Sequence, residues 1–147
     1  MPADSELSLP HTWRPLGVRL AGAFFGGALL VVCVAAWFAF DPETRAKFTP
    51  FQRGTLLFLG ALAFSAGFAL TRSRVVAEED RLVVVNGYRR REFEWAEVLA
   101  VHLPPGAPWA VLDLADGTTA AAMGIQGSDG ARARRQLREL RGLIARP

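Results

Sequence analysis

The chain has 147 residues, 51% of them hydrophobic, and its mean hydropathy is +0.20. This is too apolar for an average soluble domain, and the apolar excess lies before residue 72. The net charge is only +3, and residues 72–147 carry twelve Arg against ten Asp and Glu. That small surplus argues against nucleic acid as a main partner.

Two apolar segments predict a transmembrane helical hairpin within residues 16–71, after an N-terminal cytoplasmic segment at residues 1–15. Residues 20–40 carry no charge, and at 1.5 Å per residue they can cross a hydrocarbon core of about 30 Å. Residues 54–71 are also uncharged and are near the short limit for a span. The first segment is too long for a signal peptide and ends in bulky WFAF. A soluble helical hairpin is disfavoured because the remaining residues could not cover two wholly apolar helices.

Small residues four positions apart occur in both segments, and they allow another helix backbone to approach closely. The pairs are Gly22 with Gly26, and Ala63 with Gly67. They suggest that the two spans pack together and that a homo-oligomer could form through the same faces.

Basic residues around the spans predict the topology. The connection at residues 41–53 holds three: Arg45, Lys47 and Arg53. The other side holds eight: Arg14, Arg19, Arg72, Arg74, Arg81, Arg89, Arg90 and Arg91. The count is four against three if only the residues nearest the spans are included. The asymmetry predicts a multi-pass protein of the plasma membrane with both termini in the cytoplasm.

No pattern in the sequence indicates catalysis or a cofactor. The single cysteine, Cys33, lies within the first apolar segment, and His11 and His102 lack the spacing of metal ligands. No P-loop, GxSxG or HExxH motif occurs. We therefore expect no enzyme, no cofactor and no metal site.

Residues 72–147 predict a small antiparallel β domain, because short apolar stretches alternate with turn signals. A single helix is expected at about residues 131–145, where Ala133, Leu137, Leu140 and Ile144 form one apolar stripe and Ser128 or Asp129 could cap the first turn. Six strands are expected: Arg74–Ala77, Leu82–Val85, Tyr88–Phe93, Val98–Leu103, Trp109–Leu114 and Thr118–Met123. We expect this segment to fold alone.

Two hairpins can be tested for register. Asp116-Gly117 fits a two-residue turn that pairs Ala115 with Thr118, which would place Leu112, Leu114, Ala121 and Met123 on the core face. Asn86-Gly87 fits another, but its strict pairing puts Arg89 and Arg91 on the face of Leu82, Val84 and Phe93. Either a bulge shifts the register, which we favour, or the arginines lie beyond the covered part of the sheet.

A family resemblance rests on RLVVVNGYRRREFEWAEVLAVHL (81–103), WAVLDLADGTTAAAM (109–123) and the final helix. Together with the two spans, residues 16–145 resemble small actinobacterial membrane proteins with a bacterial pleckstrin-homology (PH) domain, the group that includes low molecular weight protein antigen 6. The resemblance implies a bent antiparallel sheet of about six or seven strands, capped by a C-terminal helix, without catalytic residues. In PH domains that bind inositol lipids, the loop between the first two strands is basic, whereas here it is AEEDR (77–81).

Two functions follow as hypotheses. The first is a membrane-tethered interaction module that binds a membrane or envelope protein. The second is a module that contacts the anionic lipids of the inner leaflet. The candidate contact residues for lipid or partner are Arg72, Arg74, Arg89, Arg90 and Arg91. Transport is disfavoured because neither span carries an ionisable side chain other than Cys33.

Overall fold

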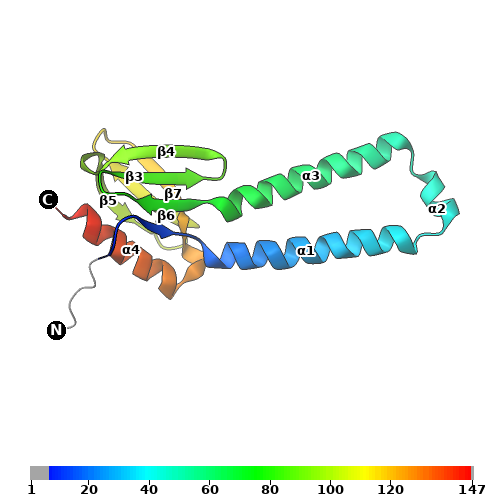
Figure 1. Ribbon diagram of the computed structural model, residues 1–147, viewed down its shortest axis with the longest axis horizontal. Helices are drawn as coiled ribbons and strands as arrows, with labels where there is room; N and C mark the ends of the chain where they lie inside the picture. Colours follow the sequence, from blue (N-terminus) through cyan, green and yellow to red (C-terminus); the bar gives the residue numbers. More distant parts are fainter. Residues whose placement is uncertain (1–6, 147) are drawn as a thin grey trace.

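The computed structural model describes residues 7–146 and shows two long helices that project from one side of a globular domain (Figure 1). Helix α1 comprises Leu16–Ala39 and helix α3 comprises Pro50–Arg72; the short helix α2, Pro42–Lys47, lies in the connection at their far end. Both long helices are long and apolar enough to cross a membrane, and neither contains a buried residue.

Local capping explains where α2 and α3 begin. The side chain of Asp41 accepts a hydrogen bond from the backbone of Thr44, and Thr49 and Gln52 form a reciprocal capping box. A proline follows each cap, at the position where its missing N–H costs nothing. Helix α3 therefore begins four residues before the uncharged segment at residues 54–71; α1 begins four residues before residue 20 and ends at Ala39.

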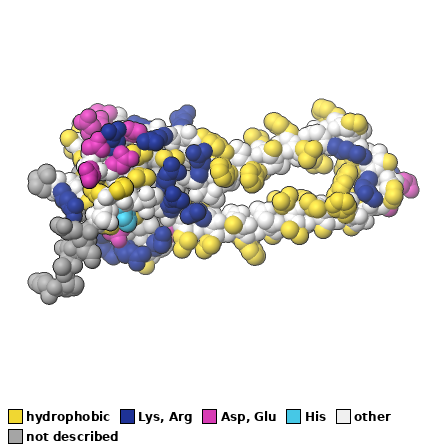
Figure 2. Space-filling model, viewed as in Figure 1, with side chains coloured by type: hydrophobic (Ala, Val, Ile, Leu, Met, Phe, Trp, Pro, Cys, Tyr) yellow, Lys and Arg dark blue, Asp and Glu magenta, His cyan; other side chains and the backbone are white. Residues whose placement is uncertain are grey.

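The two long helices approach each other at the end nearest the domain. A Cβ placed on Gly22 would lie 3.0 Å from Thr71 Cγ2, whereas one on Gly26 or Gly67 would meet no atom within 4 Å. Open space separates the helices farther along (Figure 2). Of these three small-residue positions, only Gly22 lies at the contact, and oligomerisation through the others stays a prediction.

Within residues 7–146, the domain contains seven strands in two antiparallel sheets, followed by one helix, which confirms the expected architecture. The first sheet has the order β1-β2-β3-β4, and the second has the order β5-β6-β7. The strands are β1 (His11–Trp13), β2 (Arg74–Ala77), β3 (Arg81–Asn86), β4 (Arg89–Glu94), β5 (Val98–His102), β6 (Trp109–Leu114) and β7 (Thr119–Gln126), and helix α4 is Ala131–Ile144.

Strand β1 precedes α1, in a region where the sequence had predicted only a cytoplasmic segment. It pairs antiparallel with β2, with His11 opposite Ala77 and Trp13 opposite Val75. Trp13 is 1% exposed, and its indole nitrogen donates a hydrogen bond to Glu139 Oε2 of α4 at 2.8 Å. The described part of the chain thus begins in the domain, leaves it as α1, α2 and α3, and returns to it as β2.

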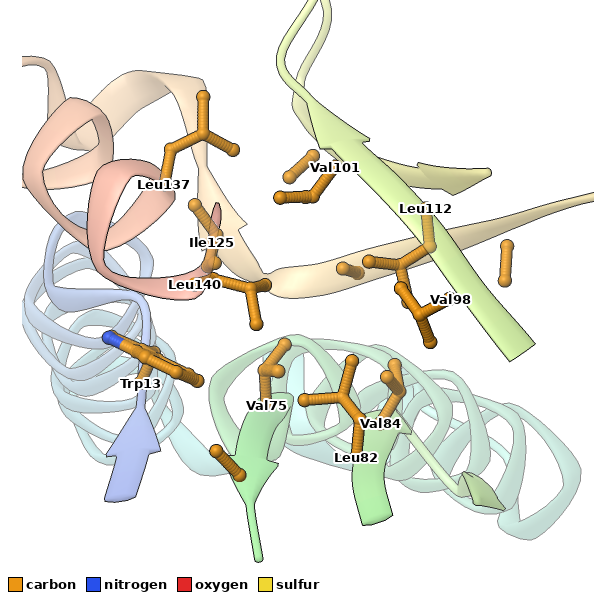
Figure 3. Packing of buried hydrophobic residues seen from close by; sticks show 14 of the residues in the cluster. Trp13, Val75, Leu82, Val84, Val98, Val101, Leu112, Ile125, Leu137 and Leu140 are labelled. Carbon is orange, nitrogen blue, oxygen red and sulfur yellow. The ribbon is translucent and has the colours of Figure 1, made fainter. Parts of the chain in front are cut away.

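The core lies between the two sheets and α4 (Figure 3). Val75 and Val84 from the first sheet face Leu112 and Ile125 from the second, and Leu140 of α4 lies next to Trp13. The sheets approach each other closely at Gly124 of β7, where an added Cβ would lie 2.5 Å from the backbone nitrogen of Val75. Only glycine permits this approach.

The register of each hairpin differs from the sequence prediction. In the β3–β4 hairpin Asn86 pairs with Arg89 and Val84 with Arg91 without interruption, so the bulge that we favoured is absent and the turn is Gly87-Tyr88. Arg91 stays exposed on the face of Val84 because β4 is the outermost strand.

The β6–β7 hairpin has a three-residue loop instead of the expected two-residue turn. Leu114 donates its backbone N–H to Thr118, and the Asp116 carboxylate accepts hydrogen bonds from the N–H and hydroxyl of Thr118. The register therefore moves by one residue. Ala120 and Ala122 are buried in place of Ala121 and Met123.

Candidate functional site

The tip of the β3–β4 hairpin lies against the end of α3 that is nearest the domain. The hydroxyl of Tyr88 is 2.8 Å from Ser65 Oγ and donates a hydrogen bond to the Ser65 carbonyl oxygen at 3.0 Å. The guanidinium carbon of Arg72 is 5.4 Å from the centre of the Tyr88 ring and 5.9 Å from that of Phe68. These are cation–π distances, so the tip and the helix end form one surface.

A buried serine fixes this arrangement. Ser73 is 0% exposed; its hydroxyl donates to the carbonyl oxygen of Ala69 and accepts from the backbone N–H of Gly87 at 2.9 Å. A Cβ on Gly87 would lie 3.3 Å from that of Ala69, and Gly87 has a φ of +62°. A glycine therefore suits this position for both its conformation and its size.

A second attachment on the same side of the domain is made to α1 (Figure 1). The Asp129 carboxylate accepts hydrogen bonds from the backbone N–H groups of Leu16 at 2.9 Å and Gly17 at 2.8 Å. Asp129 thus caps α1, whose own N-cap residue, Pro15, supplies no side-chain hydrogen bond. The sequence had assigned Ser128 or Asp129 to the cap of α4, but the N-cap of α4 is Gly130, with no side-chain cap.

The three consecutive arginines lie in three different environments. Arg90 forms an ion pair with Glu92 at 2.7 Å, and the guanidinium of Arg91 lies 4.8 Å from the centre of the Phe93 ring. Arg89 pairs through its backbone with Asn86, next to the turn. Because the strand is regular, Arg90 points to the face opposite Arg89 and Arg91.

The remaining predicted contact residue, Arg74, is half-buried in β2, with Val85 opposite on β3 and Arg90 beyond it on β4. Val85 itself is 4% exposed. The structure therefore brings Arg72 and Arg89 to the hairpin tip, and it does not gather all five arginines at one point.

Acidic residues gather at the opposite end of the hairpin, away from the long helices (Figure 2). Arg81 lies among them, with ion pairs to Asp80 at 2.6 Å and Glu92 at 2.9 Å. These contacts, led by the hydrogen bond from Arg81, lower the pKa of both carboxyl groups, and they raise the pKa of Arg81. The hairpin is therefore basic near the helices and acidic at its far end.

A shallow depression lies beside β4 at this acidic end. Its volume is about 580 Å³, and it lies between β4 and the β6–β7 loop; its lining includes Arg91, Phe93, Glu97 and Asp116. Two hydrogen bonds from Thr118, with a smaller contribution from Arg91, lower the pKa of Asp116. Within residues 7–146, β4 has no strand on its outer side.

The other strand edges are short or covered. Arg141 of α4 donates to the carbonyl oxygen of Val101 on β5, and the side chain of Asn86 bonds the backbone of β7 at Ala121 and Met123. Strand β1 has three residues. Among the described strands, the long edge without a covering segment is therefore that of β4.

The described residues contain no group of three His, Cys, Asp or Glu side chains that could hold a metal ion. Cys33 is exposed on α1. His102 lies 3.3 Å from Asp113 on the surface.

Sequence patterns did not identify the residues that join the domain to the long helices: Tyr88, Ser65 and Ser73 at α3, and Asp129 at α1. The position of Tyr88 directly after Asn-Gly was visible, but the turn was placed one residue too early. The contacts of Ser65 and Asp129 join residues that are far apart in the chain and leave no local pattern.

The comparisons with known proteins agree with this fold. Residues 72–143 match the family model described as Bacterial PH domain. The chain is 31% identical over 153 residues to the uncharacterised proteins Rv1417 of Mycobacterium tuberculosis and Mb1452 of Mycobacterium bovis. Each alignment covers 99% of this chain and 92% of the mycobacterial protein. No solved structure matches the chain at a significant level.

Proposed function

This chain belongs to the same family as these mycobacterial proteins and carries a bacterial PH domain at residues 72–143, and from this premise we propose that it is a membrane-anchored, non-catalytic interaction module. Helices α1 and α3 anchor it in the plasma membrane with both termini in the cytoplasm. The domain binds a membrane or envelope protein at the inner face. The finer resemblance to the low molecular weight protein antigen 6 type stays a prediction.

The observation that carries the proposal is the double attachment of the domain to the helices. Asp129 bonds the first residues of α1, and Ser73 joins the end of α3 to Gly87. A domain held at two points keeps one orientation, and a tethered module meets partners in the same membrane at a raised effective concentration.

The edge of β4 is the proposed contact for the protein partner. An unpaired strand edge presents backbone donors and acceptors that an extended segment can join as a further strand. Arg90 and Glu92 alternate along this edge with Arg91 and Phe93, so both faces of the added strand would meet charged groups. A partner strand of mixed charge fits best.

Photo-crosslinking in living cells tests this contact. A photoreactive amino acid at Arg90 is expected to give a discrete adduct with a membrane protein, whereas the matched position Arg138 on α4 is expected to give none. Equal adducts at both positions, or none at Arg90, would reject β4 as the contact.

Cysteine labelling tests the topology. In a Cys33→Ala background, a cysteine at Glu43 in the connection should react with an impermeant reagent in intact cells, and one at Glu79 should react only after the membrane is opened. The reverse pattern would place the domain outside the cell.

The alternative function is contact with anionic lipid by Arg72, Arg74 and the Arg89–Arg91 cluster. Glu92 already pairs with Arg90, and Arg91 lies over Phe93. This distribution favours a lipid contact at the hairpin tip over one that uses all three arginines. Each basic residue near an anionic leaflet contributes about 1 kcal/mol.

A further inference from the structure

The hairpin tip reaches a level along α3 that lies inside the apolar segment. Ser65, the partner of the Tyr88 hydroxyl, precedes Arg72 by seven positions. At 1.5 Å per residue, this is about 10 Å along the helix from its charged end. If Arg72 lies among the headgroups, whose layer is about 5 to 7 Å thick, the Tyr88 hydroxyl lies a few Å on the acyl-chain side of the boundary between headgroups and acyl chains.

The chemistry of Tyr88 suits that depth. Its hydroxyl bonds both Ser65 Oγ and the Ser65 carbonyl oxygen, so the polar end of the ring needs no water. Tyr88 itself is 59% exposed, so the protein leaves most of it uncovered. A ring with an apolar body and a satisfied polar tip is typical of the interface of a membrane.

The charges beside Tyr88 complement an anionic surface. Arg72 lies over its ring, and Arg89 follows it in the chain. The acidic residues of the hairpin lie at its other end, where Glu94 is opposite Arg81 and Glu92 is opposite Val83 in the β3–β4 register. Those pairs lie five and three rungs from the Asn86–Arg89 pair, which is roughly 17 Å and 10 Å at 3.3 Å per residue.

The tip cannot easily move away from this level. The bond from Gly87 N–H to the buried Ser73 hydroxyl and the contact with Ala69 hold it against α3 independently of Tyr88. The tip is therefore fixed relative to α3, and its depth in the membrane can change only together with that helix.

We propose that the Gly87–Arg89 tip is a fixed wedge in the cytoplasmic leaflet, with the Tyr88 ring at the boundary of the acyl chains and with Arg72 and Arg89 at anionic phospholipid headgroups. The wedge rests on the proposed anchoring of α1 and α3 in the membrane. In this form of the lipid contact, Tyr88 is the inserted residue, and Arg72 and Arg89 are the two cations that bind the headgroups.

Spin-label accessibility in the full chain, reconstituted in liposomes, tests the wedge. Single cysteines are placed at Tyr88, at lipid-facing Leu57 and at distal Glu79 in a Cys33→Ala background. The label at position 88 is expected to be several-fold less accessible to a water-soluble nickel chelate than the label at position 79, and to have the oxygen accessibility of a lipid site. The Ser73–Gly87 bond keeps the tip in place although Tyr88 itself is replaced.

The label at position 57 distinguishes a failure of the wedge from a failure of the membrane anchoring. A water-accessible label at 88 beside a lipid-embedded label at 57 would overturn the wedge alone. A water-accessible label at 57 would overturn the anchoring and the wedge together. Position 88 should lie deeper in phosphatidylglycerol than in phosphatidylcholine bilayers; equal depth would overturn the role of the anionic headgroups.

Arg72→Gln and Arg89→Gln test the cations. Each should reduce the difference between the two lipids, whereas Arg72→Lys and Arg89→Lys should retain it, because a diffuse headgroup contact depends on charge and not on bidentate geometry. Loss of the difference on the lysine substitutions would indicate a specific headgroup pocket and overturn the wedge as described.

Discussion

The carboxylate of Asp129 accepts a hydrogen bond from the backbone N–H of Gly17 at 2.8 Å, although 112 positions separate the two residues. A second bond, from Leu16, completes the cap. The loop before the last helix therefore caps the first turn of α1. Without it, two of the free N–H groups at the start of α1 would lose their partner.

Asp129→Ala should lower the free energy of unfolding by about 1 kcal/mol, the usual cost of losing an N-cap. Asp129→Asn should cost less because its amide oxygen can still accept a hydrogen bond. Thermal unfolding of the full chain in detergent measures both, and Ser128→Ala serves as the neighbouring control. Equal stability of Asp129→Ala and the wild type would show that the cap contributes nothing.

Trp13→Ala should destabilise the domain by about 3 to 5 kcal/mol, since it removes a fully buried aromatic side chain. For the same reason, residues 72–147 made alone should unfold broadly, contrary to the expectation from sequence. A synthetic peptide of residues 7–15 should restore a cooperative transition by supplying β1. Cooperative unfolding of 72–147 without the peptide would contradict this role of Trp13.

Gly124→Ala should destabilise the domain by about 1 to 3 kcal/mol or more, because the new Cβ would lie 2.5 Å from a backbone atom of the facing sheet. Gly142→Ala is the matched control: it lies within α4 and a Cβ there meets nothing within 4 Å. That change should stabilise the helix by roughly 0.5 to 1 kcal/mol. Denaturant titration of both variants should give shifts of opposite sign.

Acidification should weaken the cluster around Arg81. The pKa values of Asp80 and Glu92 are lowered from 3.8 and 4.5, so their contribution to stability is present above these values. It is lost as the pH falls through the depressed values. Arg81→Gln should make the fall in stability below pH 4.5 shallower, whereas Arg134→Gln on α4 should leave it unchanged. If stability falls with pH identically in Arg81→Gln and in the wild type, the cluster around Arg81 does not cause the loss of stability in acid.

The local sequence determined the elements themselves. The uncharged segments at residues 20–40 and 54–71 were sufficient to predict two long apolar helices, because length and hydropathy are local properties. Alternating apolar residues and turn signals predicted six of the seven strands. The spacing of Leu137 and Leu140 predicted the face that α4 buries.

Only the tertiary structure decided how these elements are joined. Strand β1 has three residues, too few for an alternating pattern to show, and it forms because β2 offers an edge and the core accepts Trp13. Local rules assigned Ser128 or Asp129 only to the cap of α4, whereas the packing of the domain against α1 places Asp129 at the start of that distant helix. The three adjacent arginines look like one cluster in the sequence, but the regular pairing of β4 with β3 turns Arg90 away from Arg89 and Arg91. In each case the deciding contact joins residues that only the folded chain brings together, so no local pattern could reveal it.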